Sequence, residues 1–141
     1  MAIAVTAASG NMGPLVIDAL LARGVRPGQI VAVVRDPAKL DAIASSGVSI
    51  RQGNYDNPPS LRAAFEGVDR VLVISGTELG RRVQQHANAI DAAVDAGVGL
   101  VAYTSVVRAG EAELNPVVAE HLGTERYLES VGVPHVILRN G

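Results

Sequence analysis

Hydrophobic positions in this chain fall into short runs, and longer amphipathic segments separate them. The runs predict six strands, at residues 3–6, 30–34, 48–52, 70–74, 99–103 and 135–138. Residues 30–34 and 71–74 are continuously apolar, which is typical of strands buried on both faces of a sheet. Residues 48–52 interleave apolar with polar side chains, so we expect this third strand at an edge.

A Gly-Val pair recurs five times, each time after a helix-like segment and before a strand-like one. The pairs occupy residues 24–25, 47–48, 67–68, 97–98 and 132–133. Glycine ends helices in the left-handed conformation, and valine favours a buried strand. Strands that alternate with helices in this way predict an α/β fold. We expect a Rossmann doubly wound parallel sheet of six strands in the order 3-2-1-4-5-6, with helices on both faces.

Helix starts are marked by a capping side chain followed by proline, at residues 36–37, 57–58 and 115–116. The first helix is expected to begin near Pro14 and to stop at Gly24. Helical spacing predicts that its apolar face contains Met12, Leu15, Val16, Ala19 and Leu20.

The loop between the first strand and this helix has the spacing Ala7-x-x-Gly10-x-x-Gly13. In that context it predicts a phosphate-binding turn at a helix N-terminus. Gly10 allows a pyrophosphate to approach the backbone, and Gly13 allows close packing of helix and strand. Asn11 and Met12 offer backbone N–H groups. The alternative is a tight turn without a ligand.

Arg35 follows the second strand, where NAD-binding sheets carry an acidic residue that bonds the ribose hydroxyl. A guanidinium suits a 2′-phosphate, and Lys39 adds a second positive charge. We therefore expect NADP(H) to be preferred over NAD(H). A solvated arginine is the alternative, and Asp36 is interpreted as a helix cap.

Candidate cofactor contacts also lie at the ends of later strands, because ligands bind beyond the carboxyl ends in such sheets. Asn54 is expected to face the adenine, and Tyr103 lies at the predicted end of the fifth strand. The segment Ser75, Gly76 and Thr77 is expected to pass beneath the nicotinamide ribose.

The Tyr-x-x-x-Lys pair of short-chain dehydrogenases is excluded, because Lys39 is the only lysine and Arg35 stands four residues before it. A P-loop is also excluded, because its lysine must lie next to the glycine-rich loop and Lys39 does not. His121 is the candidate catalytic residue, since it shares a predicted helical face with Glu125 and could orient the ribose or donate a proton. A satisfied interfacial histidine is the equal alternative. His86 is interpreted as packed.

Composition narrows the function classes. The 141 residues are 48% hydrophobic with a net charge of −2, which fits one domain, residues 1–141, and disfavours nucleic acid as a partner. The sequence has no cysteine, and its three histidines are far apart, so no protein-bound metal is expected. No apolar run suits a membrane span and no leader is visible, so a cytoplasmic location is the default expectation. A homo-oligomer is compatible with these features.

The segments AVTAASGNMG, IVAVVRDPAKL, GVSIRQGNYDNP, GVDRVLVIS and ILRNG together resemble the NmrA-like branch of the atypical short-chain dehydrogenases. The similarity is greatest to its NADPH-dependent quinone oxidoreductase type. This resemblance implies NADP(H) binding at Gly10, Asn11, Met12, Gly13 and Arg35, and it does not require the Tyr–Lys pair. It also implies that a C-terminal segment, which covers the nicotinamide and builds the substrate pocket, is absent here.

Two residues depart from the family pattern. Ala7 replaces a usual glycine, and Asn54 replaces a frequent aspartate. A left-handed backbone at residue 7 costs alanine about 1 to 2 kcal/mol.

The leading hypothesis is an NADPH-dependent oxidoreductase that reduces quinones by direct hydride transfer, with protons from water. A non-enzymatic NADP(H)-binding redox sensor is the second. A methyltransferase is weaker, because its ribose site needs an acidic residue where Arg35 stands.

Overall fold

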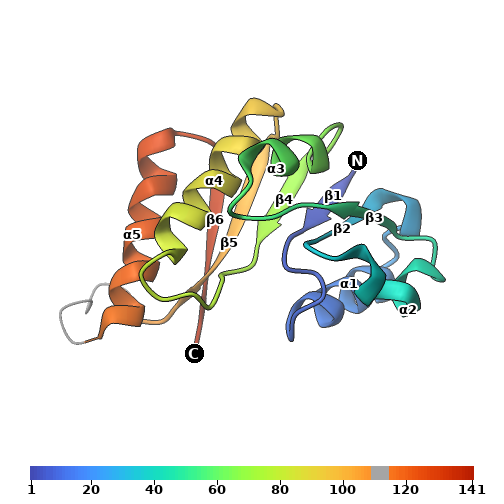
Figure 1. Cartoon of the computed structure of the whole chain (residues 1–141), viewed down its shortest axis with the longest axis horizontal. Helices are drawn as coiled ribbons and strands as arrows, with labels where there is room; N and C mark the ends of the chain where they lie inside the picture. Colours follow the sequence, from blue (N-terminus) through green and yellow to red (C-terminus); the bar gives the residue numbers. More distant parts are fainter. Residues whose placement is uncertain (109–114) are drawn as a thin grey trace.

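A computed structural model describes residues 1–108 and 115–141 of the chain. Its six strands form one parallel sheet in the order β3-β2-β1-β4-β5-β6, so the predicted order is confirmed (Figure 1). The strands are β1 Ile3–Val5, β2 Ile30–Val34, β3 Ser49–Gln52, β4 Arg70–Val73, β5 Leu100–Val106 and β6 His135–Asn140. The polar third strand lies at an edge, as its pattern predicts.

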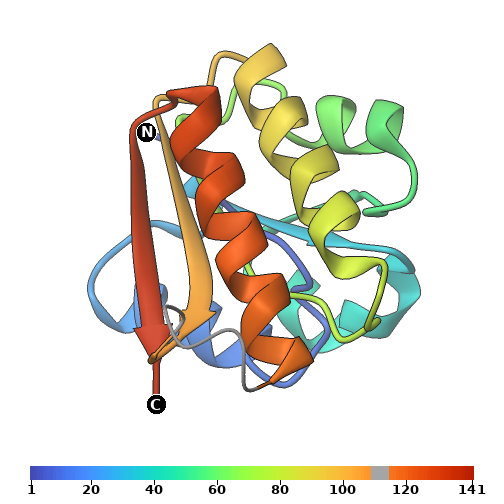
Figure 2. The same cartoon turned by 90° about the vertical axis from the view of Figure 1, so that its left-hand side faces the viewer.

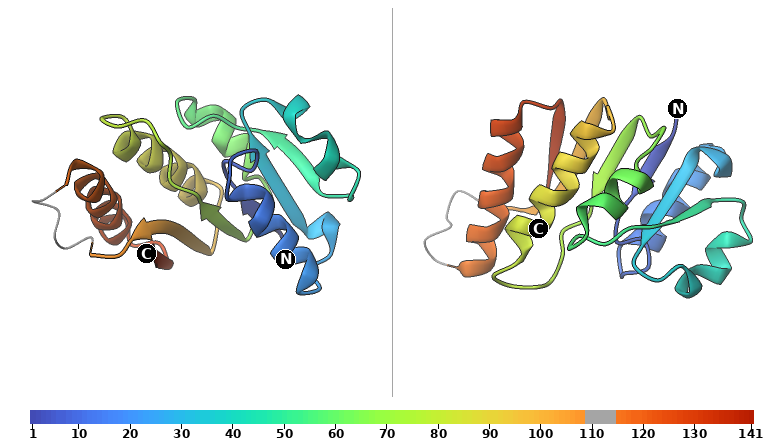
Figure 3. Two further views of the ribbon diagram at one scale, coloured as in Figure 1. Left: turned by 90° about the horizontal axis from the view of Figure 1, so that it is seen from below. Right: turned by 45° about the horizontal axis from the view of Figure 1, so that its top comes forward.

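Helices cover both faces of the sheet, and the structure has three layers (Figures 1 and 3). The helices are α1 Gly13–Ala22, α2 Asp41–Ala44, α3 Pro58–Ala64, α4 Arg82–Asp95 and α5 Pro116–Val131, with 3-10 turns η1 at Pro27–Gln29 and η2 at Pro37–Leu40. Helices α3, α4 and α5 pack side by side on one face, while α1 and α2 lie on the other.

Two hydrophobic clusters fill the space between the layers. Ala4 and Val33 face the cluster under α3, α4 and α5, whereas their neighbours Val5 and Val34 face the cluster with Ile17 of α1. Side chains of adjacent residues in a strand point to opposite faces, so the all-apolar β2 supplies both clusters.

The predicted helix signals are confirmed. The glycines of all five Gly-Val pairs have positive φ angles, at Gly24, Gly47, Gly67, Gly97 and Gly132. The side-chain oxygens of Asp36, Asn57 and Asn115 accept hydrogen bonds from backbone N–H groups two or three residues later.

The buried face of α1 differs from the predicted one. Gly13 and Ile17 are buried, whereas Leu15 is 68% exposed and Ala19 is also exposed. A Cβ on Gly13 would lie 2.5 Å from the Cα of Ala8, so α1 packs tightly against the loop after β1 at Gly13. This contact turns the helix, and the buried face is centred on Gly13 and Ile17.

The β5–β6 end of the sheet is covered by α5 on one face (Figure 2). On the opposite face Val136 and Leu138 are 43% and 42% exposed, so this part of the sheet is open to solvent. Among the residues that the structure describes, no helix is long and apolar enough to cross a membrane.

Candidate functional site

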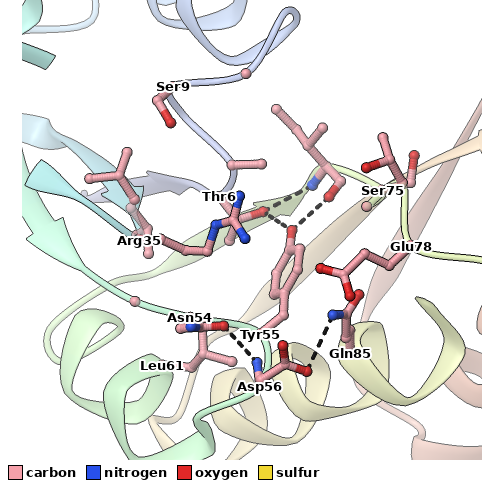
Figure 4. A pocket seen from close by; sticks show the side chains of 18 of the residues that line it. Thr6, Ser9, Arg35, Asn54, Tyr55, Asp56, Leu61, Ser75, Glu78 and Gln85 are labelled. Carbon is pink, nitrogen blue, oxygen red and sulfur yellow. Dashed lines mark hydrogen bonds between the residues drawn. The ribbon is translucent and has the colours of Figure 1, made fainter. Parts of the chain in front are cut away.

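A cavity of about 380 Å³ lies where the carboxyl ends of β1, β2, β3 and β4 meet (Figure 4). Its walls come from the loops that follow these four strands, with Leu61 of α3 and Gln85 of α4. Nine of the predicted cofactor-binding residues line it: Ala7, Gly10, Asn11, Met12, Arg35, Asn54, Ser75, Gly76 and Thr77. The topology therefore gathers four separate sequence segments at one edge.

The loop after β1 forms one wall of the cavity. Ala7 has a φ of 47°, so this alanine occupies the left-handed conformation that is costly for residues with a Cβ. The N–H of Gly10 donates to the carbonyl oxygen of Ala7 at 3.0 Å and closes the turn. Met12 caps α1 without a side-chain hydrogen bond. The first N–H groups of this ten-residue helix are therefore available to an anion.

Gly13 lies outside the cavity, directly behind this loop. The Ala8 backbone leaves no room for a Cβ at this position, which fits the packing role predicted for Gly13.

Arg35 lines the cavity at the end of β2, and its side chain is exposed. The side-chain amide of Gln52 donates to the carbonyl oxygen of Arg35 at 3.1 Å, which fixes the backbone there. Within residues 1–108 and 115–141 the Arg35 guanidinium forms no ion pair. Lys39 is exposed in η2 and is not part of the cavity wall.

Tyr55 also lines the cavity, although it is not among the predicted site residues. Its hydroxyl lies 2.7 Å from Thr6 Oγ1 and 2.6 Å from the carbonyl oxygen of Ile74 (Figure 4). Burial raises the pKa of Tyr55, so its hydroxyl stays protonated. Its place directly after Asn54, at a predicted strand end, was an available signal. Tyr55 thus joins the loop after β3 to the ends of β1 and β4.

The rim near Tyr55 is charged. Asp56 Oδ1 accepts hydrogen bonds from Arg81 at 2.7 Å and from Gln85 at 3.2 Å. Arg81 also pairs with Glu78 at 3.0 Å. The side-chain oxygen of Asn54 accepts from the N–H of Asp56 at 2.9 Å, so Asn54 shapes this loop.

The structure does not bring Tyr103 to the cavity. Strand β5 continues to Val106, three residues beyond the predicted end, so Tyr103 is an interior strand residue paired with Val73 and Ile137. Its side chain is fully buried under the α4–α5 face, and burial raises its pKa to about 12.

His121, the candidate catalytic residue, is also outside the cavity wall. It is 4% exposed, and its Nδ1 lies 2.7 Å from the Tyr103 hydroxyl. Burial and the nearby Arg82 lower its pKa. This position matches the alternative interpretation of His121, that of a hydrogen-bonded histidine packed between elements. His86 is fully buried, as expected for a packed residue.

Glu125 does not pair with His121 but accepts hydrogen bonds from Ser105 at 2.6 Å and from Arg139. Burial alone would raise the pKa of Glu125, yet these hydrogen bonds outweigh it and the pKa is lowered. Across the described residues, no three His, Asp or Glu side chains are grouped as metal ligands.

Residues 7–141 match the family described as NAD(P)H-binding. This chain belongs to that family. Quinone oxidoreductase 2 of Escherichia coli (strain K12) is 43% identical over 139 residues, which are 99% of this chain and 48% of that protein. The NmrA-like family domain-containing oxidoreductase flvB of Aspergillus flavus is 29% identical over 97% of this chain and 46% of its own length. These matches confirm the family resemblance.

Solved structures extend the similarity to three dimensions. The Escherichia coli NADPH-dependent quinone oxidoreductase complexed with NADPH has a TM-score of 0.93, with 43% identity over 99% of this chain and 48% of that one. The Citrobacter sp. triphenylmethane reductase complexed with NADP(H) has a TM-score of 0.94, with 42% identity over 99% and 49%. The chain spans about half the length of the relatives it matches.

Proposed function

We propose that this chain is the cofactor-binding part of an NADPH-dependent reductase that transfers a hydride to a small acceptor, a quinone. One observation carries the proposal: the glycine loop, the free N-terminus of α1 and the cation of Arg35 border the same cavity. The names and bound NADP(H) of the similar proteins support it.

In this proposal different residues bind different parts of the cofactor. The N–H groups around Asn11 and Met12 hold the pyrophosphate at the start of α1. Arg35 binds the 2′-phosphate with a charge-assisted hydrogen bond. Asn54 lies near the adenine, and the Ser75–Thr77 segment lies under the nicotinamide ribose. Lys39, Tyr103 and His121 have no direct contact in this arrangement.

Bound NADPH would supply the hydride, and the chain would orient the cofactor and exclude side reactions. A quinone takes up two electrons with the hydride to give a hydroquinone anion, which water then protonates. This suits a cavity whose carboxylates, Asp56 and Glu78, are paired with Arg81. Such a reaction does not require a buried acid at the cavity.

We further propose that residues 1–141 act as one nucleotide-binding domain and that the rest of such a reductase completes the substrate site. The half-length match to the relatives is consistent with this division.

Calorimetric titration of the chain with NADPH and NADH tests the cofactor assignment. A charge-assisted hydrogen bond contributes about 1.5 to 3 kcal/mol, so NADPH should bind roughly 10- to 100-fold more tightly than NADH. Arg35→Ser should remove this difference. Arg26→Ser is the matched control, because Arg26 is exposed beside η1, at the amino end of the sheet.

Equal affinity for NADPH and NADH, or discrimination that survives Arg35→Ser, would contradict the role of Arg35. Binding of neither nucleotide would contradict the assignment of the cavity. Quinone-dependent oxidation of NADPH by the longest natural form of the protein tests the reaction itself. Equal affinity for NADPH and NADP⁺ without hydride transfer would instead favour the sensor hypothesis.

A further inference from the structure

The segment Ser75–Thr77 borders the cavity without belonging to a helix or strand, yet side chains hold its backbone from behind. The N–H of Ser75 donates to Thr104 Oγ1 of β5 at 2.9 Å. The N–H of Gly76 donates to Nε2 of His86, on α4, at 2.9 Å. Two successive peptide groups of the cavity wall are therefore fixed by residues from two other elements.

The hydrogen bonds of His86 determine which ring nitrogen carries the proton. A backbone N–H can only donate, so Nε2 must accept from Gly76. The proton then lies on Nδ1, which is 2.9 Å from Thr124 Oγ1 of α5. The Thr124 hydroxyl can donate onward to the carbonyl oxygen of Glu120 at 3.3 Å. Only the neutral Nδ1–H ring satisfies every partner.

The surroundings of His86 keep the ring neutral. Arg82 on α4, His121 on α5, Tyr103 on β5 and Tyr55 from the loop after β3 face it. Burial, followed by the charge of Arg82, lowers the pKa of His86 to about 3. The acceptor at Nε2 is therefore present throughout the physiological pH range.

A fixed N–H also fixes the carbonyl group on the other side of the same peptide bond. The Ser75–Gly76 peptide has no cis bond, so the carbonyl oxygen of Ser75 points opposite to the Gly76 N–H, away from His86. His86 is fully buried behind the loop. The Ser75 carbonyl thus faces away from the interior, on a residue that lines the cavity.

We propose that His86 is a positioning residue that locks the Ser75–Gly76 peptide and thereby presents the Ser75 carbonyl as a hydrogen-bond acceptor to the nicotinamide half of the cofactor. The donor class that fits is a hydroxyl or carboxamide group. This inference rests on the proposed function, since it assigns that end of the cavity to the nicotinamide half.

The test compares two ligands in variants of this chain. NADPH contains both halves of the cofactor, whereas adenosine 2′,5′-bisphosphate contains only the half assigned to Arg35. His86→Leu removes the acceptor and should weaken NADPH binding about ten-fold while leaving adenosine 2′,5′-bisphosphate unchanged. His86→Gln retains an acceptor and a donor and should restore most of the affinity. His135→Leu, at the amino end of β6, is the control and should change neither.

Equal weakening of both ligands, or unchanged NADPH binding in a folded His86→Leu variant, would overturn the inference. If that variant does not fold, nitrogen NMR of the histidine-labelled wild-type chain decides it, because a proton on Nε2 excludes the proposed lock. If the wild-type chain binds neither ligand, the proposed function fails, whereas the NMR measurement still decides the state of the His86–Gly76 hydrogen bond.

Discussion

The two walls of the cavity are built on different principles. The wall near α1 and Arg35 is made from backbone, glycine and an exposed cation, and the cluster behind it is aliphatic. The wall at Ser75–Thr77 is held by hydrogen bonds from Thr104 and His86, and the space behind it contains buried polar side chains. One wall depends on close approach, and the other on matched donors and acceptors.

This difference determines which kind of substitution disrupts each wall. Added volume damages the first wall, because Gly13 of α1 packs directly against the backbone of the loop at Ala8. Loss of a polar partner damages the second wall, because a buried N–H without an acceptor costs about 1 to 3 kcal/mol. Three substitutions and a pH series test this contrast.

Gly13→Ala should have the largest effect. Helix propensity alone favours alanine by about 1 kcal/mol, but the new Cβ would lie 2.5 Å from the Ala8 backbone. We expect a net loss of about 3 kcal/mol in the free energy of unfolding, measured by urea denaturation. Gly28→Ala is the control, because its Cβ meets nothing within 4 Å. Equal stability of the two variants would contradict the contact.

Acid should lower the stability of the folded chain mainly through His86, which lies behind the second wall. The pKa of His86 is about 3 in the folded chain against an ordinary 6.5, so between these values the unfolded chain binds the extra proton. Stability is therefore complete above pH 6.5 and falls below it, by up to about 1.4 kcal/mol per pH unit for this group. His121 acts in the same direction.

Urea midpoints measured from pH 7 to pH 5 check this expectation. His86→Gln should flatten the slope, because it removes the group whose pKa differs most from its ordinary value. A midpoint that is constant over this range in the wild-type chain would contradict the neutral, buried ring.

Thr104→Val should have an intermediate effect. Valine nearly matches threonine in shape but leaves the N–H of Ser75 without its acceptor. We expect a loss of about 1 to 3 kcal/mol and faster hydrogen exchange of the Ser75 amide, measured by NMR. Thr104→Ser keeps the hydroxyl and should retain most of the protection. Unchanged exchange in the valine variant would show that the hydroxyl does not hold this wall.

Ala7→Gly should have the smallest effect, and it is stabilising. Glycine removes the backbone strain that alanine has at a φ of 47°, which is about 1 to 2 kcal/mol. Part of this gain is lost because glycine also gives the unfolded chain more conformational entropy. We expect a net gain of about 0.5 to 1 kcal/mol in thermal or urea denaturation. Ala19→Gly, on the exposed face of α1, should instead destabilise the chain. Destabilisation by both substitutions would show that residue 7 is not strained.

The sequence alone predicts the structure correctly where a local pattern of residues determines it. Gly-Val pairs such as Gly24-Val25 predict the returns to the sheet, and the polar third strand predicts its edge position. The first wall follows the same rule, because the loop at Gly10 and the position of Arg35 are each encoded in a few neighbouring residues.

Prediction was weaker where contacts between distant residues decide the structure. Tyr103 was placed at a strand end, but pairing with β4 and β6 extends β5 past it. The bond from Gly76 to His86 and the contact of Tyr55 with Thr6 join separate elements, so no local pattern reports them. The buried face of α1 also differs from the predicted one, although the contact there is local, between Gly13 and the Ala8 backbone that shortly precedes it.

The position of β1 has a consequence for synthesis. Translation produces this three-residue strand before the other five strands of the sheet, yet it lies between β2 and β4 in the finished sheet. A nascent chain that has not reached Arg70–Val73 leaves one edge of β1 without its partner. The residues for the glycine loop are therefore made long before the opposite wall, and the cavity can be complete only after synthesis has passed β4.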